Sequence, residues 1–84
     1  MTLLNHVNWN TMASSILKAE LIRRNISYDQ LITLLAKIDV HETRASILNK
    51  MSRGSFQFTF FLQCAKAIGM AQLRLDDIEE PKAD

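Results

Sequence analysis

The sequence predicts an all-α fold, a compact domain of four to five helices with a helix-turn-helix at its centre. Apolar residues recur at helical spacing in four windows, and the two glycines and the proline lie where the predicted helices end. An alternating, strand-like pattern occurs only at 57–60. A length of 84 residues fits one domain. We expect an N-terminal arm (1–10), the helix-turn-helix domain (11–75) and an acidic, flexible tail (76–84).

The first two helices are predicted from their apolar faces and their caps. The first runs from about Thr11 to Arg24, and Glu20 falls on its apolar face, where a rim position paired with Arg23 or Arg24 is expected. That face consists of Trp9, Met12, Ala13, Ile16 and Leu17. The second starts at Ser27, which forms a capping-box pattern with Gln30, and ends near Lys37 to Asp39. Its buried stripe consists of Leu31, Leu34, Leu35 and Ile38.

The third predicted helix runs from Glu42 or Thr43 to Arg53, and Gly54 then suits a left-handed helix stop. Its apolar side carries Ile47, Leu48 and Met51, with Arg44 projecting there in the first turn. Its outer side carries Glu42, Ser46, Asn49, Lys50 and Arg53.

The fourth predicted helix runs from an N-cap at Ser55 to Ile68 and stops at Gly69. It is apolar nearly all round, so we expect a central helix packed on several sides. Leu73 and Leu75 then reach the core, either in a last turn or in a short extended segment.

Composition argues against several classes of protein. No apolar run approaches the ~20 residues of a membrane span, the start lacks a signal-peptide pattern, and one cysteine cannot form an internal disulfide, so cytoplasm is the expected location. His6 and His41 lack ligand or catalytic partners at useful spacing, and Cys64 fits a buried structural thiol. We therefore expect no enzyme activity, metal, cofactor or small-molecule ligand. A net charge of +1 gives little support to nucleic-acid binding, which depends instead on where the charges lie.

The second and third helices carry the candidate binding surface. Asn, Arg, Lys and Ser side chains, as at Ser46, Asn49, Lys50 and Arg53, bond base edges or phosphates. The start of the second helix, at Ser27, Tyr28 and Gln30, offers donors to a phosphate. An ordinary solvated helix face explains the same residues, and a protein–protein adaptor or antitoxin-like module on this scaffold is the alternative function.

Three strings resemble the lambda-repressor-like (Cro-type) helix-turn-helix proteins: Arg24-Asn25-Ile26-Ser27-Tyr28-Asp29-Gln30-Leu31, Ile47-Leu48-Asn49-Lys50-Met51-Ser52-Arg53-Gly54 and Phe61-Leu62-Gln63-Cys64-Ala65-Lys66-Ala67-Ile68-Gly69. The resemblance spans about Ile16 to Ile78. The second helix and its turn are together longer than in that family by roughly three or four residues. The turn in that motif usually has about three or four residues. The chain is also similar to a group of small bacterial proteins that share Lys-Met-Ser-Arg-Gly-Ser-Phe, which implies no particular activity.

The lambda-repressor-like resemblance implies sequence-specific binding of double-stranded DNA by a small transcriptional regulator. It implies base readout by Ala45, Ser46, Asn49 and Lys50. Phosphate contacts are expected from Ser27, Tyr28, Gln30, Arg44, Arg53 and Ser55. A homodimer is expected to use Leu3 to Trp9 or Leu73 to Ile78.

Overall fold

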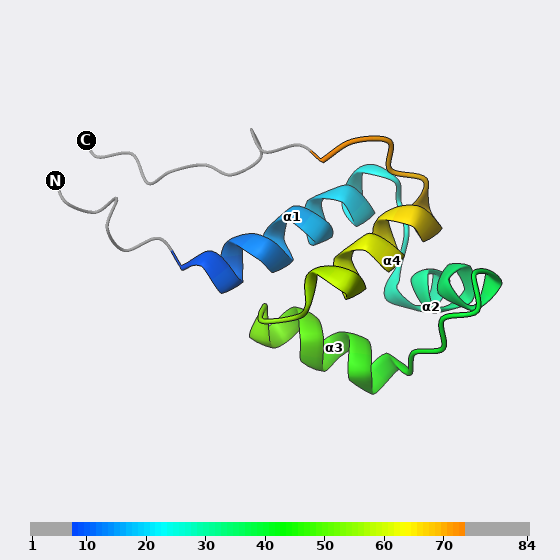
Figure 1. The fold of residues 1–84 in the computed structure, drawn as a ribbon, viewed down its shortest axis with the longest axis horizontal. Helices are drawn as coiled ribbons and strands as arrows, with labels where there is room; N and C mark the ends of the chain where they lie inside the picture. Colours follow the sequence, from blue (N-terminus) through cyan, green and yellow to red (C-terminus); the bar gives the residue numbers. More distant parts are fainter. Residues whose placement is uncertain (1–7, 74–84) are drawn as a thin grey trace, which may run out of the picture.

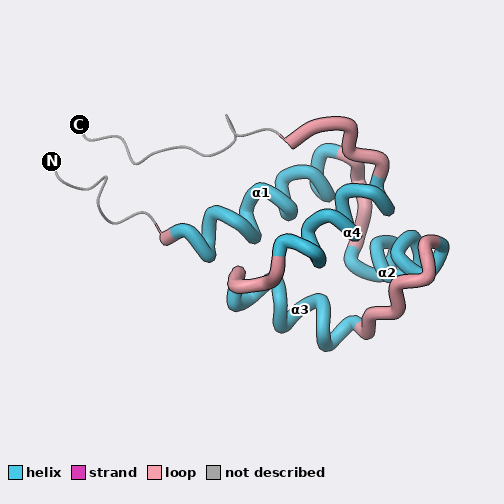
Figure 2. Tube along the Cα trace, in the orientation of Figure 1, coloured by secondary structure: helices cyan, strands magenta, loops and turns pink. Residues whose placement is uncertain are grey.

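The computed structural model describes residues 8–73, which form four helices and no strand (Figures 1 and 2). They are α1 (Trp9–Arg23), α2 (Tyr28–Lys37), α3 (Arg44–Arg53) and α4 (Phe58–Ile68). Our expectations for residues 1–7, for Leu75, for the tail at 76–84 and for most of both dimer surfaces lie outside the described residues. Within 8–73, no helix is long and apolar enough to cross a membrane.

Each helix is followed by one residue in the left-handed conformation. After α3 and α4 this residue is glycine, as predicted, with φ of 73° at Gly54 and 82° at Gly69. After α1 and α2 it is Asn25 (φ 56°) and Asp39 (φ 63°), the polar residue types that tolerate this conformation best. The predicted ends of the first two helices, Arg24 and Lys37 to Asp39, also agree with the structure within a residue, but the left-handed residue was predicted only at the two glycines.

Three of these stops share one hydrogen-bond pattern that anchors the following apolar residue. The backbone N–H groups of Ile26, Val40 and Met70 donate to carbonyls five residues earlier, at 2.9, 3.0 and 2.9 Å. These are the long bonds of a Schellman motif, whose next residue commonly packs against the helix it closes. All three side chains are partly buried against the core, so each helix stop also directs the chain back onto the core.

The helix starts explain where the elements begin. Capping boxes open α2, between Ser27 and Gln30, and α3, between Thr43 and Ser46. The prediction that Ser55 caps the fourth helix was wrong, because the N-cap is Gln57, two residues later, and it makes no side-chain cap hydrogen bond. An edge-on contact between Phe56 and Phe60, with ring centroids 5.2 Å apart, fixes the path of the chain there instead.

The core lies where α2 packs against α4 and α1 packs against α3. Its six most deeply buried large side chains come from all four helices: Leu17, Leu31, Leu35, Ile47, Met51 and Cys64. Of the stripe predicted for the second helix, Leu31 and Leu35 are buried, Leu34 is half-buried and Ile38 is exposed. The long α1 closes one side of this core, and α3 lies along the lower edge of the molecule in Figure 1.

Two expectations for the first helix need correction. Helix α1 begins at Trp9, capped by Asn8, and the Trp9 side chain is 66% exposed instead of packed on the apolar face. Glu20 is buried rather than at the rim. Its carboxylate does pair with both predicted partners, Arg23 at 2.7 Å and Arg24 at 3.4 Å, and these pairs offset the cost of burying its charge.

Helix α4 is not packed on every side as its composition predicted. Phe60, Phe61, Cys64 and Ile68 are buried, but Phe58 is 64% and Leu62 is 52% exposed. These two residues stand one turn apart, so α4 presents an apolar strip to solvent. Leu73, expected on the core, is also exposed.

The end of α3 is pressed against the start of α1. A Cβ added to Gly54 would meet the backbone carbonyl oxygen of Asn10 at 2.1 Å, whereas one added to Gly69 would meet nothing within 4 Å. Only glycine therefore permits this approach, and the contact sets how α3 sits against α1.

We predict that Gly54→Ala destabilises the fold far more than Gly69→Ala. Both substitutions incur the left-handed penalty of about 1–2 kcal/mol, but only the first also displaces the backbone of α1. Urea unfolding should show a free-energy loss for Gly54→Ala at least twice that for Gly69→Ala. Equal losses would mean that α1 and α3 are not in this close contact.

Candidate nucleic-acid interface

Helices α2 and α3 are the two helices predicted to form a helix-turn-helix, and the six residues 38–43 join them. This connection exceeds the usual three or four residues, in line with the predicted longer turn. The Arg44 guanidinium donates to the Asp29 carboxylate at 2.6 Å, so the first turn of α3 lies beside the first turn of α2. Both side chains are more than half exposed, so the pair adds little stability, but it shows that the two helix starts face the same region.

The start of α2 keeps hydrogen-bond donors free although its capping box is closed. The Ser27 hydroxyl oxygen accepts from the Gln30 backbone N–H group, and the Gln30 side-chain oxygen accepts from the Ser27 backbone N–H group. In both bonds the side chain acts as the acceptor, so its own donors are not used. The Ser27 hydroxyl hydrogen and the Gln30 side-chain NH₂ group, together with the first amides of the helix, remain available to an anion. The predicted Tyr28 is half-buried against the core.

A Glu42–Lys50 ion pair holds one flank of α3. The Lys50 ammonium donates to both Glu42 oxygens, at 2.8 and 2.9 Å, and lies 4.9 Å from the centre of the Phe60 ring. The two side chains are only 29% and 13% exposed. Burial raises the pKa of the Glu42 carboxyl group, but hydrogen bonds from Lys50 and Ser46 and the charge of Lys50 lower it, so that the net pKa lies below its ordinary value.

The same flank engages Ser46. Its hydroxyl oxygen accepts from the Thr43 amide at 3.0 Å, and its hydroxyl hydrogen is shared between the Glu42 carboxylate and the Thr43 carbonyl. Among the four residues predicted to read bases, Ser46 and Lys50 are therefore committed to the protein itself. Lys50 neutralises the Glu42 carboxylate, and Ser46 donates a hydrogen bond to it.

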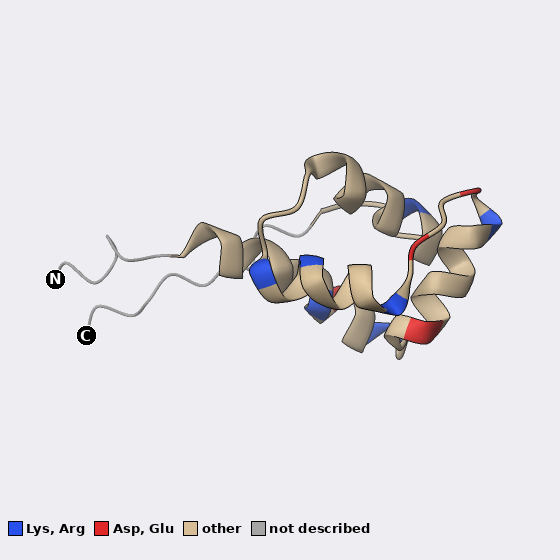
Figure 3. Cartoon of the chain, turned by 90° about the horizontal axis from the view of Figure 1, so that it is seen from below, with Lys and Arg blue, Asp and Glu red and all other residues tan. Residues whose placement is uncertain are grey.

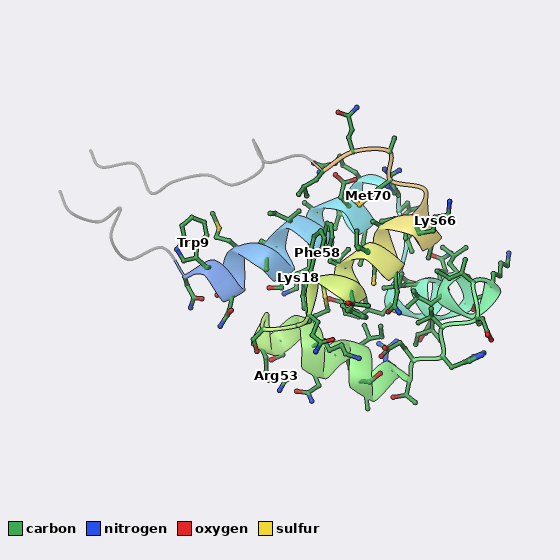
Figure 4. The ribbon with its side chains drawn as sticks, in the orientation of Figure 1. Trp9, Lys18, Arg53, Phe58, Lys66 and Met70 are labelled. Carbon is green, nitrogen blue, oxygen red and sulfur yellow. The ribbon has the colours of Figure 1, made fainter. Side chains whose placement is uncertain are left out.

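The outermost face of α3 carries the other predicted residues. Ala45, Asn49 and Arg53 are exposed, and neither Asn49 nor Arg53 has a hydrogen-bond or ion-pair partner within residues 8–73. Figure 4 shows Arg53 at the far end of α3, pointing away from the other helices. Ser55 is exposed in the loop that follows. Ala45 and Asn49, one turn apart, and Arg53 one turn further form a continuous row.

Sequence reasoning missed two members of this face. Leu48 was expected to pack with Ile47 and Met51, yet it is 44% exposed, and Ser52 is exposed as well. The helix is thus turned so that Ser46 and Lys50 lean toward α4, while Leu48 and Ser52 turn outward. The pattern of polar residues did not reveal this, because Glu42 lies before the helix, where helical spacing does not predict which way its side chain points.

Net positive charge lies in the described part of the chain, because the acidic residues are concentrated after it. Residues 8–73 contain eight Lys and Arg against four Asp and Glu, whereas residues 74–84 contain two against five. The described part therefore has a net charge of +4, and the overall +1 conceals it. Viewed toward α3, Figure 3 shows basic positions at both ends of the helix.

The other reactive side chains of the described part of the chain do not form a site. Cys64 is buried, and desolvation raises the pKa of its thiol to about 12, with the nearby Glu42 charge adding to the effect. Residues 8–73 contain no group of three metal-ligating side chains. The His41 Nε2 atom lies 3.1 Å from a carboxylate oxygen of the exposed Asp39.

The fold and this surface define a small four-helix domain with a central pair of short helices. Residues 9–73 match the family described as a domain of unknown function, DUF6471, and the chain belongs to that family. No curated protein and no solved structure matches the chain.

We predict that the Glu42–Lys50 pair stabilises the fold in a pH-dependent way. Because the folded pKa of Glu42 is lowered, its contribution is present above the ordinary value of 4.5 and is lost as pH falls through the folded pKa. A double-mutant cycle with Glu42→Gln and Lys50→Gln should give a coupling of about 1–3 kcal/mol at pH 7. The coupling should decline as pH falls below 4.5 and through the folded pKa of Glu42, and a coupling that stays constant through the acid titration of Glu42 would contradict the assignment.

Proposed function

We propose that this chain binds double-stranded DNA sequence-specifically through a lambda-repressor-like helix-turn-helix, as a small transcriptional regulator. In this proposal α3 enters the major groove and α2 crosses the phosphate backbone. The observation that carries the proposal is the exposed row Ala45, Asn49 and Arg53, whose two polar members have no partner in the described chain. A groove supplies the donors and acceptors that these groups lack.

Each residue of the row suits a task in the groove. The Asn49 amide matches the donor and acceptor pair on the edge of adenine, and Arg53 can bond guanine or a phosphate. The short Ala45 lets the helix backbone approach the bases closely. Lys50 and Ser46 act indirectly, because they hold the helix in the rotation that presents the row.

The neighbouring start of α2 supports the same function. Its free donors at Ser27 and Gln30 lie on the side of the molecule marked by the Arg44–Asp29 contact. Amides and hydroxyls at a helix start are typical phosphate ligands. The net charge of +4 in residues 8–73 adds electrostatic attraction that the whole-chain value hides.

A protein–protein module is a second candidate function, and a different surface favours it. The strip formed by Phe58 and Leu62 on α4 is apolar and exposed, and Phe58 stacks on Phe61 with centroids 5.9 Å apart. Exposed aromatic and aliphatic side chains of this kind often mark protein contacts. This strip contributes nothing to the row on α3, so variants separate the two functions.

We predict salt-dependent binding of the full chain to mixed duplex DNA. The logarithm of the binding constant should fall by several units per tenfold rise in salt if several phosphates are neutralised. Arg53→Ala should weaken binding to all sequences and reduce the slope by about 1, whereas Lys66→Ala, on the far end of α4 (Figure 4), should change neither. Absence of binding at ~50 mM salt would refute the DNA function and leave the α4 strip as the candidate surface.

We predict that Asn49 supplies sequence preference rather than general affinity. On a duplex selected by the wild-type chain, Asn49→Ala should cost about 1–3 kcal/mol, while its affinity for random duplexes should stay unchanged. Fluorescence anisotropy on both duplexes measures the difference, and Arg53→Ala provides the contrasting case of uniform loss. Equal losses on both duplexes for Asn49→Ala would assign it to phosphate instead of base contact.

A further inference from the structure

Leu48 is an apolar side chain on the otherwise polar face of α3. It is 44% exposed although its chain neighbour Ile47 is fully buried. Two constraints produce this placement: Ile47 and Met51 fill the core, and the Glu42–Lys50 pair fixes the opposite flank of the helix. Leu48 therefore cannot turn inward without breaking one of them.

The surroundings of Leu48 connect it to the row proposed to read DNA. Ala45 precedes Leu48 by three residues and Asn49 by four, so its methyl group lies between these two side chains on the helix surface. Arg44, one turn before Leu48, contacts Asp29 of α2. Leu48 thus lies on the side of α3 that faces the start of α2, within the surface that the proposed function places on DNA.

We propose that Leu48, together with Ala45, contacts the 5-methyl group of thymine, so that the recognised site contains a T next to or within the A·T pair read by Asn49. This inference rests on the proposed function and specifies its ligand. The thymine methyl group is the apolar feature of the major-groove edge, and aliphatic side chains contact it. An exposed leucine among Ala45, Asn49 and Ser52 has that group as its complementary partner.

The test removes the methyl group from the DNA without changing base pairing. A duplex is selected from random sequences with the full wild-type chain, and each thymine is replaced in turn by deoxyuridine. The adenine read by Asn49 is the one for which the Asn49→Ala variant loses its preference. At one or two positions beside this adenine, replacement of thymine by deoxyuridine should lower the wild-type affinity roughly fourfold, the value expected for one buried methyl group. Leu48→Ala should discriminate clearly less between the thymine and deoxyuridine duplexes, because only the smaller contact of Ala45 with the methyl group then remains.

The control is Ile22→Ala, which removes a 78% exposed aliphatic side chain from α1 and should retain full discrimination between thymine and deoxyuridine. A selected site without a required thymine, or wild-type affinity that is indifferent to every replacement, would overturn the inference while leaving DNA binding intact. A change of oligomeric state in Leu48→Ala with discrimination retained would assign Leu48 to a protein contact instead. Failure of every duplex to bind would instead reject the proposed function itself.

Discussion

The orientation of α3 depends on the ion pair between Glu42 and Lys50. Glu42 lies just before the helix and Lys50 lies two turns into it, and their contact sits over the Phe60 ring of α4. The pair itself lies within the α3 segment, and the contact of Lys50 with the Phe60 ring links that segment to α4 and opposes rotation of α3 about its axis. Because Ser46 bonds the same carboxylate, the polar side chains nearest α4 are satisfied internally, and those on the opposite side remain exposed. The candidate interface is a consequence of this division.

The helices themselves follow from local rules. Helix starts and stops that depend on contacts within one turn can be predicted from the sequence. The capping boxes at Ser27 and Thr43 and the glycines at 54 and 69 are of this kind. The helix stops at Asn25 and Asp39 use residue types that also occur in many other settings, so residue type alone does not predict a stop there. The hydrogen bonds at these stops join backbone N–H groups to backbone carbonyls. The predicted start of α4 was wrong for a related reason. Ser55 is a residue type that often caps helices, but the Gly54 contact with α1 and the Phe56–Phe60 contact extend the loop before α4.

The candidate site was only partly predictable because its members have tertiary partners. Spacing placed Asn49 and Arg53 on the outer face correctly, since both follow the helical period. It also placed Ser46 and Lys50 there, because a count of residues cannot show that Glu42 folds back to meet them. The prediction for Leu48 was wrong in the opposite sense, because this residue was expected to be buried and is exposed. The apolar character of Leu48 predicted burial, but Ile47 and Met51 fill the core beneath α3. The Glu42–Lys50 ion pair opposes the rotation of α3 that would bring Leu48 into the core in their place.

The two candidate functions use separate surfaces, so evidence for one does not count against the other. The DNA hypothesis depends on α3 and the start of α2, where polar groups lack partners within the described chain. The protein-contact hypothesis depends on Phe58 and Leu62 of α4, where apolar area faces solvent. Burying that strip against another protein is favourable through the hydrophobic effect and needs no charge, whereas the α3 surface gains from phosphate charge and loses with salt. Salt dependence therefore separates the two surfaces physically, even in a molecule that uses both.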